Sequence, residues 1–360
     1  MKHCFILWTR PEIIKCYSCI KYAEEHGLDF FIIHSNQHYS ENMDKIFFEE
    51  LWLPQPKYNL WVNWWWHGSM TWRMLIEIEK ILIEERPDVV YVQWDTNTVL
   101  AWWLVASKMW IKVAHIEAWL RSYDRTMPEE INRICVDHLA DYLFAPTEKQ
   151  KWILLKEWIE ENKIFVVWNT IVDAVLWIKE KNKDLSDKIL EKYGLKKDWY
   201  FLLTTHRPSN VDWKESLKNI LEWVNYLKEI SWKDILFPIH PRTRNNIEKF
   251  WLSNLLSNIK VIEPVWFIEN VIFESNSYMI VTDSWWIQEE WCILEKKTLV
   301  LRENTERPET LEVWWAILVW NSKELLVDSF RVLKEKVVNW YNPFWDGKTC
   351  EYIIETTNNN

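Results

Sequence analysis

Glycine is nearly absent from this chain, which has 4 glycines in 360 residues. A typical globular protein of this length has about 25. Tryptophan deviates in the opposite direction with 30 residues, so the two counts together come close to an ordinary glycine count. A chain this poor in glycine lacks the residue that tight turns and left-handed backbone require.

The tryptophans occupy the places where glycine usually works. They follow predicted strands or form adjacent pairs, as at Trp8, Trp94, Trp119, Trp168, Trp102-Trp103, Trp285-Trp286 and Trp314-Trp315. Because a close-packed interior has no room for so many indole rings at tight turns, we hypothesise that most of them are glycines in the native protein. A UGA codon, which different bacterial lineages read as glycine or as tryptophan, would produce this pattern. An intact mass of the native protein that matches the printed sequence would contradict it.

Other absences narrow the class of protein. No hydrophobic run reaches the roughly 18 residues of a membrane span, and residues 1–7 predict a short strand and not a signal peptide. The net charge of −10 argues against a nucleic-acid or membrane-surface partner, because both require a basic face. Six scattered cysteines suit a reducing compartment. We therefore expect a cytoplasmic protein in which any anionic ligand is held by a local basic cluster.

Short apolar runs such as residues 89–92 alternate with helix-like segments, which is typical of parallel strands buried on both faces. The first half predicts strands at 2–7, 28–34, 88–93, 112–116, 141–145 and 163–167. The second half predicts strands at 200–205, 235–239, 259–262, 278–282, 298–301 and 316–319. This alternation predicts an α/β protein with two doubly wound, Rossmann-like parallel sheets and a ligand cleft between them, at the carboxyl ends of the strands.

The predicted domains are an N-terminal one at 1–180, a nucleotide-binding one at 181–340, and a C-terminal helical segment at 341–360 that packs back on the first. The polar segment 182–198 is interpreted as the crossing between the two domains.

Polar residues follow several predicted strands of the first half. Arg10 and Lys15 come after the first strand and could clamp a phosphate or form a solvated surface pair. Asp95 and Glu117 each follow one of two successive strands, which suggests general acid and base catalysis. For Asp95 a helix cap or a buried ion pair is the alternative. Glu129 and Arg133 begin a helix and are also spaced for an ordinary salt bridge.

The second half offers histidines and a phosphate turn. His206 and His240 each follow a predicted strand and could transfer protons, donate to a phosphate, or be structural. Residues 282–290 predict a strand, a tight turn and a helix start, with Ser284 at the N-cap position, where free amide groups favour a phosphate. Trp285 and Trp286 stand where glycine would let the phosphate approach. A later polar loop adds the cations Arg302 and Arg307.

Seven motifs together carry a resemblance. They lie at residues 9–12, 93–96, 117–121, 128–133, 169–173, 282–290 and 305–309. In this order, over nearly the full chain, they resemble the non-hydrolysing UDP-N-acetylglucosamine (UDP-GlcNAc) 2-epimerases. The family has glycine where this chain has Trp8, Trp94, Trp119, Trp168, Trp285 and Trp286.

The resemblance implies a GT-B architecture, no nicotinamide or metal cofactor, usually a homodimer, and a role in cell-surface polysaccharide biosynthesis. Ser284 and the backbone of Trp285 and Trp286 would hold the diphosphate, and Glu290 the ribose hydroxyls. Further parts of the nucleotide sugar would contact Arg10, Lys15, His206 and Arg307, with Asp95, Glu117 and Glu129 near the sugar.

The reaction that the resemblance implies interconverts UDP-GlcNAc and UDP-ManNAc. UDP leaves by anti elimination, giving 2-acetamidoglucal, and then adds back with the proton on the opposite face. A GT-B glycosyltransferase would share the fold and the diphosphate site. If the tryptophans are real, a non-catalytic nucleotide-sugar-binding scaffold is the third reading.

Overall fold

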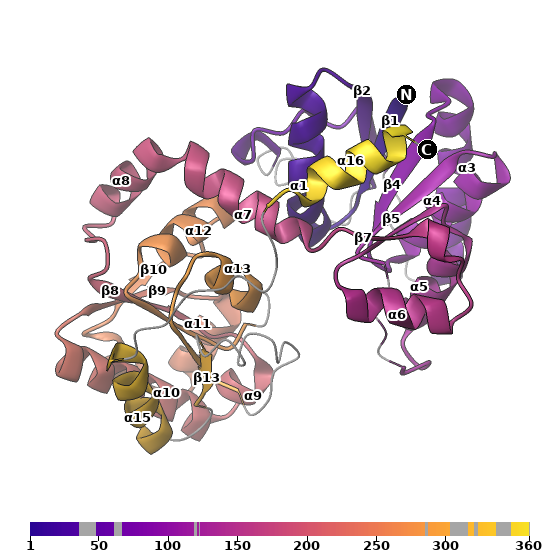
Figure 1. Ribbon diagram of the computed structural model, residues 1–360. Coiled ribbons are helices and arrows are strands. Elements are labelled where there is room, and N and C mark those ends of the chain that lie inside the picture. Colours follow the sequence, from indigo (N-terminus) through magenta and orange to yellow (C-terminus); the bar gives the residue numbers. More distant parts are fainter. Residues whose placement is uncertain are drawn as a thin grey trace. The chain divides into compact units, whose positions relative to one another are not determined.

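The computed structural model describes residues 1–35, 48–60, 67–118, 121, 123–284, 287–302, 316–319, 323–335 and 347–359. The chain forms two compact units (Figure 1). Unit 1 consists of Met1–Ala174 and Trp345–Asn360, and unit 2 of Val175–Phe344. Among the described residues, no helix is both long and apolar enough to span a membrane.

Unit 1 is built on a seven-stranded parallel sheet in the order β3-β2-β1-β4-β5-β6-β7. Its strands are β1 (Lys2–Leu7), β2 (Asp29–His34), β3 (Tyr58–Asn59), β4 (Val89–Gln93), β5 (Lys112–Ile116), β6 (Tyr142–Ala145) and β7 (Ile164–Val166). Every residue of β4 is buried, as expected for a central strand covered on both faces. The order reverses beside β1, which is the switch point where doubly wound sheets bind ligands.

The helices of unit 1 cover both faces of the sheet. They are α1 (Arg10–Glu25), α3 (His67–Glu85), α4 (Asn97–Lys108), α5 (Pro128–Leu139), α6 (Glu148–Lys156), the short η1 (Glu161–Lys163) and α16 (Thr349–Asn359). Cys4 and Ile6 share a core with α3 and α4, whereas the alternate residue Phe5 stacks on Tyr91 of the other face. On that face α16 lies along α1, and Thr357 of α16 hydrogen-bonds Tyr91 at 2.6 Å (Figure 1).

Unit 2 has a six-stranded parallel sheet in the order β10-β9-β8-β11-β12-β13. The strands are β8 (Tyr200–Thr204), β9 (Asp234–Pro238), β10 (Lys260–Ile262), β11 (Met279–Thr282), β12 (Thr298–Val300) and β13 (Ala316–Leu318). The helices are α8 (Lys183–Lys192), α9 (Pro208–Val211), α10 (Lys214–Ser231), α11 (Pro241–Lys249), η2 (Ser253–Leu256), α12 (Phe267–Asn276), α13 (Ile287–Ile293) and α15 (Lys323–Glu335). Helix α7 (Thr170–Lys181) carries the chain from unit 1 into unit 2.

The predicted class, two doubly wound parallel sheets, is confirmed, and all twelve predicted strands are present within two residues of their predicted bounds. The two-residue β3 and the four-residue α9 were not predicted. The predicted crossing at 182–198 instead contains α8, because Ile189 and Leu190 bury an apolar face that its many charges conceal in the sequence. The helix-like segment between β9 and β10 forms two helices, α11 and η2.

Tryptophan and glycine share one position after five helices. Gly27 and Gly194 have positive φ directly after the last helical residue and its cap, and so do Trp110, Trp158 and Trp251. In each case the next residue is apolar and donates its N–H to the carbonyl five residues earlier, as in Ile159 to Leu154 at 3.2 Å. This is the Schellman motif, whose left-handed residue is usually glycine. The indoles of Trp110, Trp158 and Trp251 are 94%, 94% and 87% exposed, so no packing favours them there.

Other tryptophans are misplaced in the core. Trp102, Trp103 and Trp291 are buried, and their indole N–H groups meet no acceptor among the described residues. A buried donor without an acceptor destabilises the fold by about 1–3 kcal/mol. Both the exposed and the buried indoles therefore support the hypothesis that glycine occupies most of these positions.

Tryptophan-to-glycine substitution at two positions of the α6 region distinguishes a left-handed position after the helix from a position inside it. Trp158→Gly relieves a left-handed tryptophan just beyond the helix and should raise the free energy of unfolding by about 1 kcal/mol. Trp152→Gly, inside α6, should lower it by about 1 kcal/mol, because glycine weakens a helix interior. Urea denaturation followed by circular dichroism measures both. A destabilising Trp158→Gly would contradict the interpretation.

Candidate active site

In each unit the predicted site residues follow the carboxyl ends of parallel strands. In unit 1, Glu117 follows β5 directly and has a φ of +60°, in the left-handed region that glutamate rarely adopts. Its carboxylate is buried and accepts hydrogen bonds from Lys15 Nζ and, at 2.9 Å, from Gln93 Nε2. Strain of this kind persists only where the surroundings fix it, and it is common at active sites. Glu117 is thus a carboxylate held in one orientation.

Lys15 is as deeply buried as its partner, with 2% of its surface exposed. It lies on α1 and also donates to Asn169 Oδ1 at 3.0 Å, just before α7. The structure therefore places Lys15 against Glu117, whereas the sequence suggested a phosphate clamp or a surface pair. Its charge neutralises the buried carboxylate, which would otherwise be strongly destabilising.

Asp95, which follows β4, has its own cation. Arg133 Nε donates to Asp95 Oδ2 at 2.6 Å, and Arg133 also reaches Glu130 at 3.2 Å. Burial raises the pKa of Asp95 above its ordinary value, and Arg133 opposes this rise. The predicted i,i+4 pair of Glu129 with Arg133 is not the one formed, because the arginine turns inward to Asp95 and Glu130 while Glu129 stays exposed.

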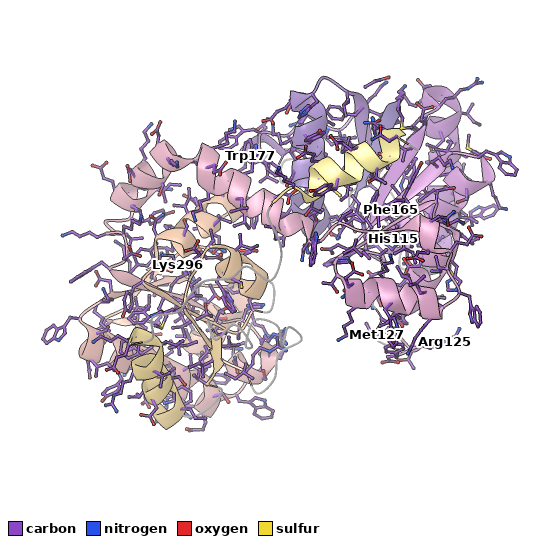
Figure 2. All side chains as sticks on the ribbon, in the orientation of Figure 1. His115, Arg125, Met127, Phe165, Trp177 and Lys296 are labelled. Atoms are coloured by element: carbon purple, nitrogen blue, oxygen red, sulfur yellow. The ribbon has the colours of Figure 1, made fainter. Side chains whose placement is uncertain are left out.

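A buried ionic network supports the loop that carries Asp95. His115, labelled in Figure 2, lies near the end of β5, with Nδ1 at 2.6 Å from Asp137 and Nε2 at 2.9 Å from the carbonyl oxygen of Trp94. Burial would raise the pKa of Asp137, but His115 and Arg121 outweigh it and hold the pKa below its ordinary value. Both ring nitrogens of His115 are therefore held, one by a carboxylate and one by a backbone carbonyl, which fixes the orientation of the imidazole.

In unit 2 the carboxylate of Asp283 joins the ends of β8 and β11. It accepts from Thr205 Oγ1 at 2.8 Å, from the backbone N–H of His206 and Arg207 at 3.0 and 2.9 Å, and from Asn210 Nδ2 at 3.1 Å. Burial would raise the pKa of Asp283, but these hydrogen bonds and His206 hold it below its ordinary value. Asp283 therefore fixes the loop that presents His206.

His206 and His240 come together at the ends of β8 and β9, with their ring centroids 5.6 Å apart. His206 Nδ1 is 3.3 Å from Asp283. Burial, together with His206 and Arg242, lowers the pKa of His240. His240 is then neutral near pH 7 and can both donate and accept a hydrogen bond.

Ser284 and Glu290 are buried at the end of β11 and on α13. Ser284 N–H donates to Thr282 Oγ1 at 3.0 Å, which closes the turn after the strand. The side chain of Arg10, both Trp285 and Trp286, and Arg307 lie outside the described part of the chain.

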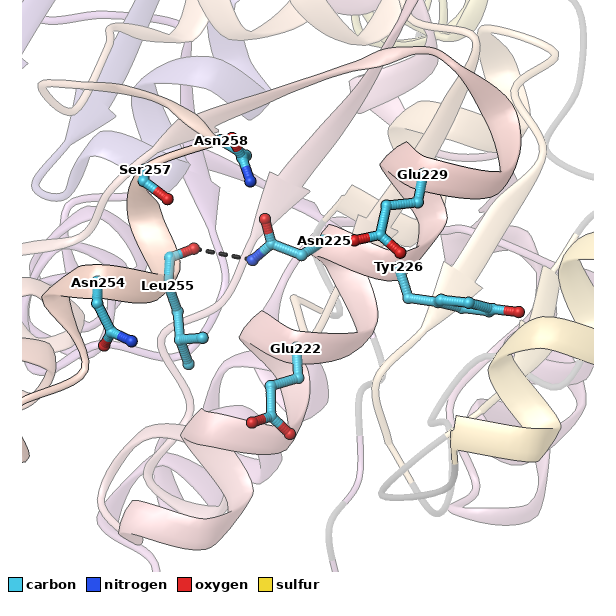
Figure 3. A pocket seen from close by; sticks show the side chains of 8 residues that line it. All are labelled: Glu222, Asn225, Tyr226, Glu229, Asn254, Leu255, Ser257 and Asn258. Atoms are coloured by element: carbon cyan, nitrogen blue, oxygen red, sulfur yellow. Dashed lines mark hydrogen bonds between the residues drawn. The ribbon is translucent and has the colours of Figure 1, made fainter.

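A separate hollow of about 380 Å³ lies between α10 and the η2 region of unit 2 (Figure 3). Its walls are Glu222, Asn225, Tyr226 and Glu229 of α10 and Asn254, Leu255, Ser257 and Asn258 in and after η2. Asn225 Nδ2 holds the Leu255 carbonyl at 2.8 Å. This lining contains two glutamates and no cation, so it does not suit an anionic nucleotide.

Comparison with known proteins decides the family. The family model described as UDP-N-acetylglucosamine 2-epimerase matches residues 21–358. The UDP-N-acetylglucosamine 2-epimerase of Methanocaldococcus jannaschii is 55% identical over 360 residues, which cover 98% of each chain. The chain belongs to the UDP-N-acetylglucosamine 2-epimerase family.

The solved structures agree. The structure of the M. jannaschii UDP-GlcNAc 2-epimerase has a TM-score of 0.92 at 52% identity and matches all of both chains. A second structure of that enzyme, in complex with UDP-GlcNAc and UDP, has a TM-score of 0.79 at 53% identity, again over all of both chains. The two parallel-sheet units are thus the GT-B-like fold of this family, whose enzymes are isomerases.

Gln93, Asn169, Thr205, Asn210 and Asp283 were missed as individual site residues in the sequence. All but Asn210 stand in the quoted motifs or beside His206, but their contacts cannot be deduced from the sequence. Gln93 and Asn169 each hold one partner of the Glu117–Lys15 pair. Their position is the available signal, because Gln93 is the last residue of β4 and Asn169 lies shortly after β7.

The Asp283 cluster predicts a pH-dependent stability. At pH 7, Asp283→Asn should lower the free energy of unfolding by about 1.5–3 kcal/mol, because it removes an ionised acceptor from buried donors. The folded pKa lies below the ordinary 3.8, so this contribution is present above pH 3.8 and is lost as pH falls through the folded value. Urea denaturation should show a smaller difference in the free energy of unfolding between Asp283→Asn and the unmodified protein at pH 3 than at pH 7.

Asp212→Asn is the matched control. Asp212 pairs with Arg242 at the surface of the same unit, where solvent screens the pair, so its substitution should change stability little at either pH. An equal loss of stability in both variants would contradict the role given to Asp283.

Proposed function

We propose that this chain epimerises UDP-GlcNAc at C2 to UDP-ManNAc, by anti elimination of UDP to 2-acetamidoglucal and re-addition. Family membership and the M. jannaschii structure in complex with UDP-GlcNAc and UDP support the substrate. The observation that carries the mechanism is the pair of buried carboxylates, Asp95 and Glu117, at the ends of neighbouring strands β4 and β5.

The chemistry requires two such groups. The hydrogen at C2 is not next to a carbonyl, so direct deprotonation is out of reach. Loss of UDP develops positive character at C1, which acidifies C2 and lets a carboxylate remove the proton. Re-addition then needs a proton delivered to the opposite face. Two carboxylates in different surroundings can divide these roles.

The surroundings of the two carboxylates differ in this way. Glu117 is paired with the ammonium group of Lys15 and suits the base. Asp95, whose pKa is raised by burial, suits a group that holds a proton. We propose that they exchange these roles between the forward and reverse reactions, with Glu129 nearby on α5 as a third carboxylate.

Unit 2 supplies the leaving-group site in this proposal. His206 and His240 donate to the diphosphate, Ser284 and the backbone after it bind its oxygens, and Glu290 accepts from the ribose hydroxyls. Arg10 and Arg307 add positive charge that stabilises departing UDP. No acceptor substrate is needed, because the glycal itself takes UDP back.

One incubation tests the proposal. UDP-GlcNAc alone in deuterated water should yield UDP-ManNAc with deuterium at C2, seen by proton NMR. Free ManNAc with UDP would instead show a hydrolase. Unchanged UDP-GlcNAc would contradict the proposal and favour a transferase that awaits an acceptor.

Variants assign the carboxylates in the same assay. Glu117→Gln and Asp95→Asn should each lower kcat by about 10²–10⁴-fold, because each removes a proton-transfer group while preserving shape. His138→Gln is the control. His138 is exposed on α5, where its Nδ1 contacts the Ile134 carbonyl, so the kcat of this variant should match that of the unmodified protein.

A further inference from the structure

Two buried glutamates lie on neighbouring helices of unit 2. Glu274 of α12 is 0% exposed and Glu290 of α13 is 6% exposed. The two helices are in contact, and Oε2 of each carboxyl is buried and meets no N–H or O–H donor among the described residues. The carboxyl of Glu290 lies close enough to raise the pKa of Glu274, which is consistent with direct contact of the two groups. Two carboxylates have no hydrogen between them, so such a contact requires that one of the pair carries a proton.

The surroundings assign that proton to Glu274. Among the described residues it forms no ion pair, and its Oε2 meets no N–H or O–H donor from the protein. Asn270 Nδ2 donates to the other oxygen, Oε1, at 2.5 Å, which leaves Oε2 as the atom that carries the hydrogen. Tyr200, which approaches from β8, gives its own O–H to the Phe273 carbonyl at 2.7 Å. An isolated buried charge without a cation is strongly disfavoured, so Glu274 is neutral.

The pKa agrees with this assignment. Complete burial, together with the negative charge of Glu290, raises the pKa of Glu274 well above its ordinary value.

We propose that Glu274 is a positioning residue of the nucleotide site: as a neutral acid it donates a hydrogen bond to Glu290 and holds that carboxylate toward the ribose hydroxyls of a uridine diphosphate. This rests on the proposed function, in which Glu290 binds the ribose. Glu290 can then accept from the 2′- and 3′-hydroxyls with its remaining lone pairs, in one fixed rotamer. Glu274 touches no ligand atom.

A ligand that lacks one hydroxyl tests this coupling. Calorimetric titration of the full chain with UDP and with 2′-deoxy-UDP should show about ten-fold weaker binding of the deoxy ligand. Glu274→Met keeps the volume of the side chain but removes the donor. It should weaken UDP binding about ten-fold and leave 2′-deoxy-UDP nearly unchanged, because only the ribose contact depends on the donor.

Two further variants complete the set. Glu274→Gln retains an N–H donor for Glu290 and should bind UDP within about two-fold of the unmodified protein. Glu269→Gln, on the same helix and paired with Lys192 at the surface, is the control and should bind both ligands normally. A merely structural role for Glu274 would instead weaken both ligands equally in Glu274→Met.

A second measurement does not depend on the folding of Glu274→Met. The infrared spectrum at pH 7 should contain the carbonyl stretch of protonated carboxyls, and the difference spectrum between the unmodified protein and Glu274→Gln should show that one such band is lost. Absence of that loss from the difference spectrum, or a Glu274→Met variant that still prefers UDP, would overturn the inference. Failure of the unmodified protein to bind UDP would overturn the proposed function and this inference together, whereas UDP binding with an unchanged preference would overturn the inference alone.

Discussion

A carboxylate removed from water must be compensated, and that requirement organises both units. Glu117 is compensated by Lys15, and Asp95 by Arg133. Asp137 has His115 and Arg121, whereas Asp283 relies on N–H and O–H donors from the loop after β8. Each solution fixes the geometry of a loop at a strand end, because the compensating group must come within hydrogen-bond distance. The contacts that neutralise the buried carboxylates therefore also determine the conformation of the loops.

The compensation also sets what each carboxylate can do. Glu117 contacts a buried lysine, whereas burial raises the pKa of Asp95, so the two carboxyl groups differ in their tendency to hold a proton. His115 contacts the carbonyl oxygen of residue 94, so the loop that carries Asp95 is held by a hydrogen bond as well as by packing. Backbone strain adds to this: residues 94, 117 and 168, each after a strand of unit 1, have positive φ.

The strands could be predicted from the sequence because each is a short apolar run, and a buried parallel strand needs little else. The ion pairs between side chains could not be predicted from the sequence. Lys15 meets Glu117 across 102 residues of sequence and Arg133 meets Asp95 across 38, so only the folded sheet brings them together. The sequence predicts a crossing between domains where α8 lies, because the charged residues of this helix outnumber the two buried residues that anchor it. Charged residues at strand ends can be recognised in the sequence, but the amides that hold them look like ordinary polar residues until the contacts are known.

The return of the chain to unit 1 has a consequence for biosynthesis. Asp173, at the start of α7, caps the first turn of α16 through the N–H of Cys350 at 2.7 Å, and α16 buries Ile353 and Ile354 in unit 1. The ribosome synthesises α16 only after all of unit 2. Until then, the face of α1 that α16 covers is exposed to solvent in the nascent first unit. Unit 2 is continuous in the chain and can complete its folding before unit 1 does. The order in which the two units can be completed is thus the reverse of the order in which they begin to be synthesised.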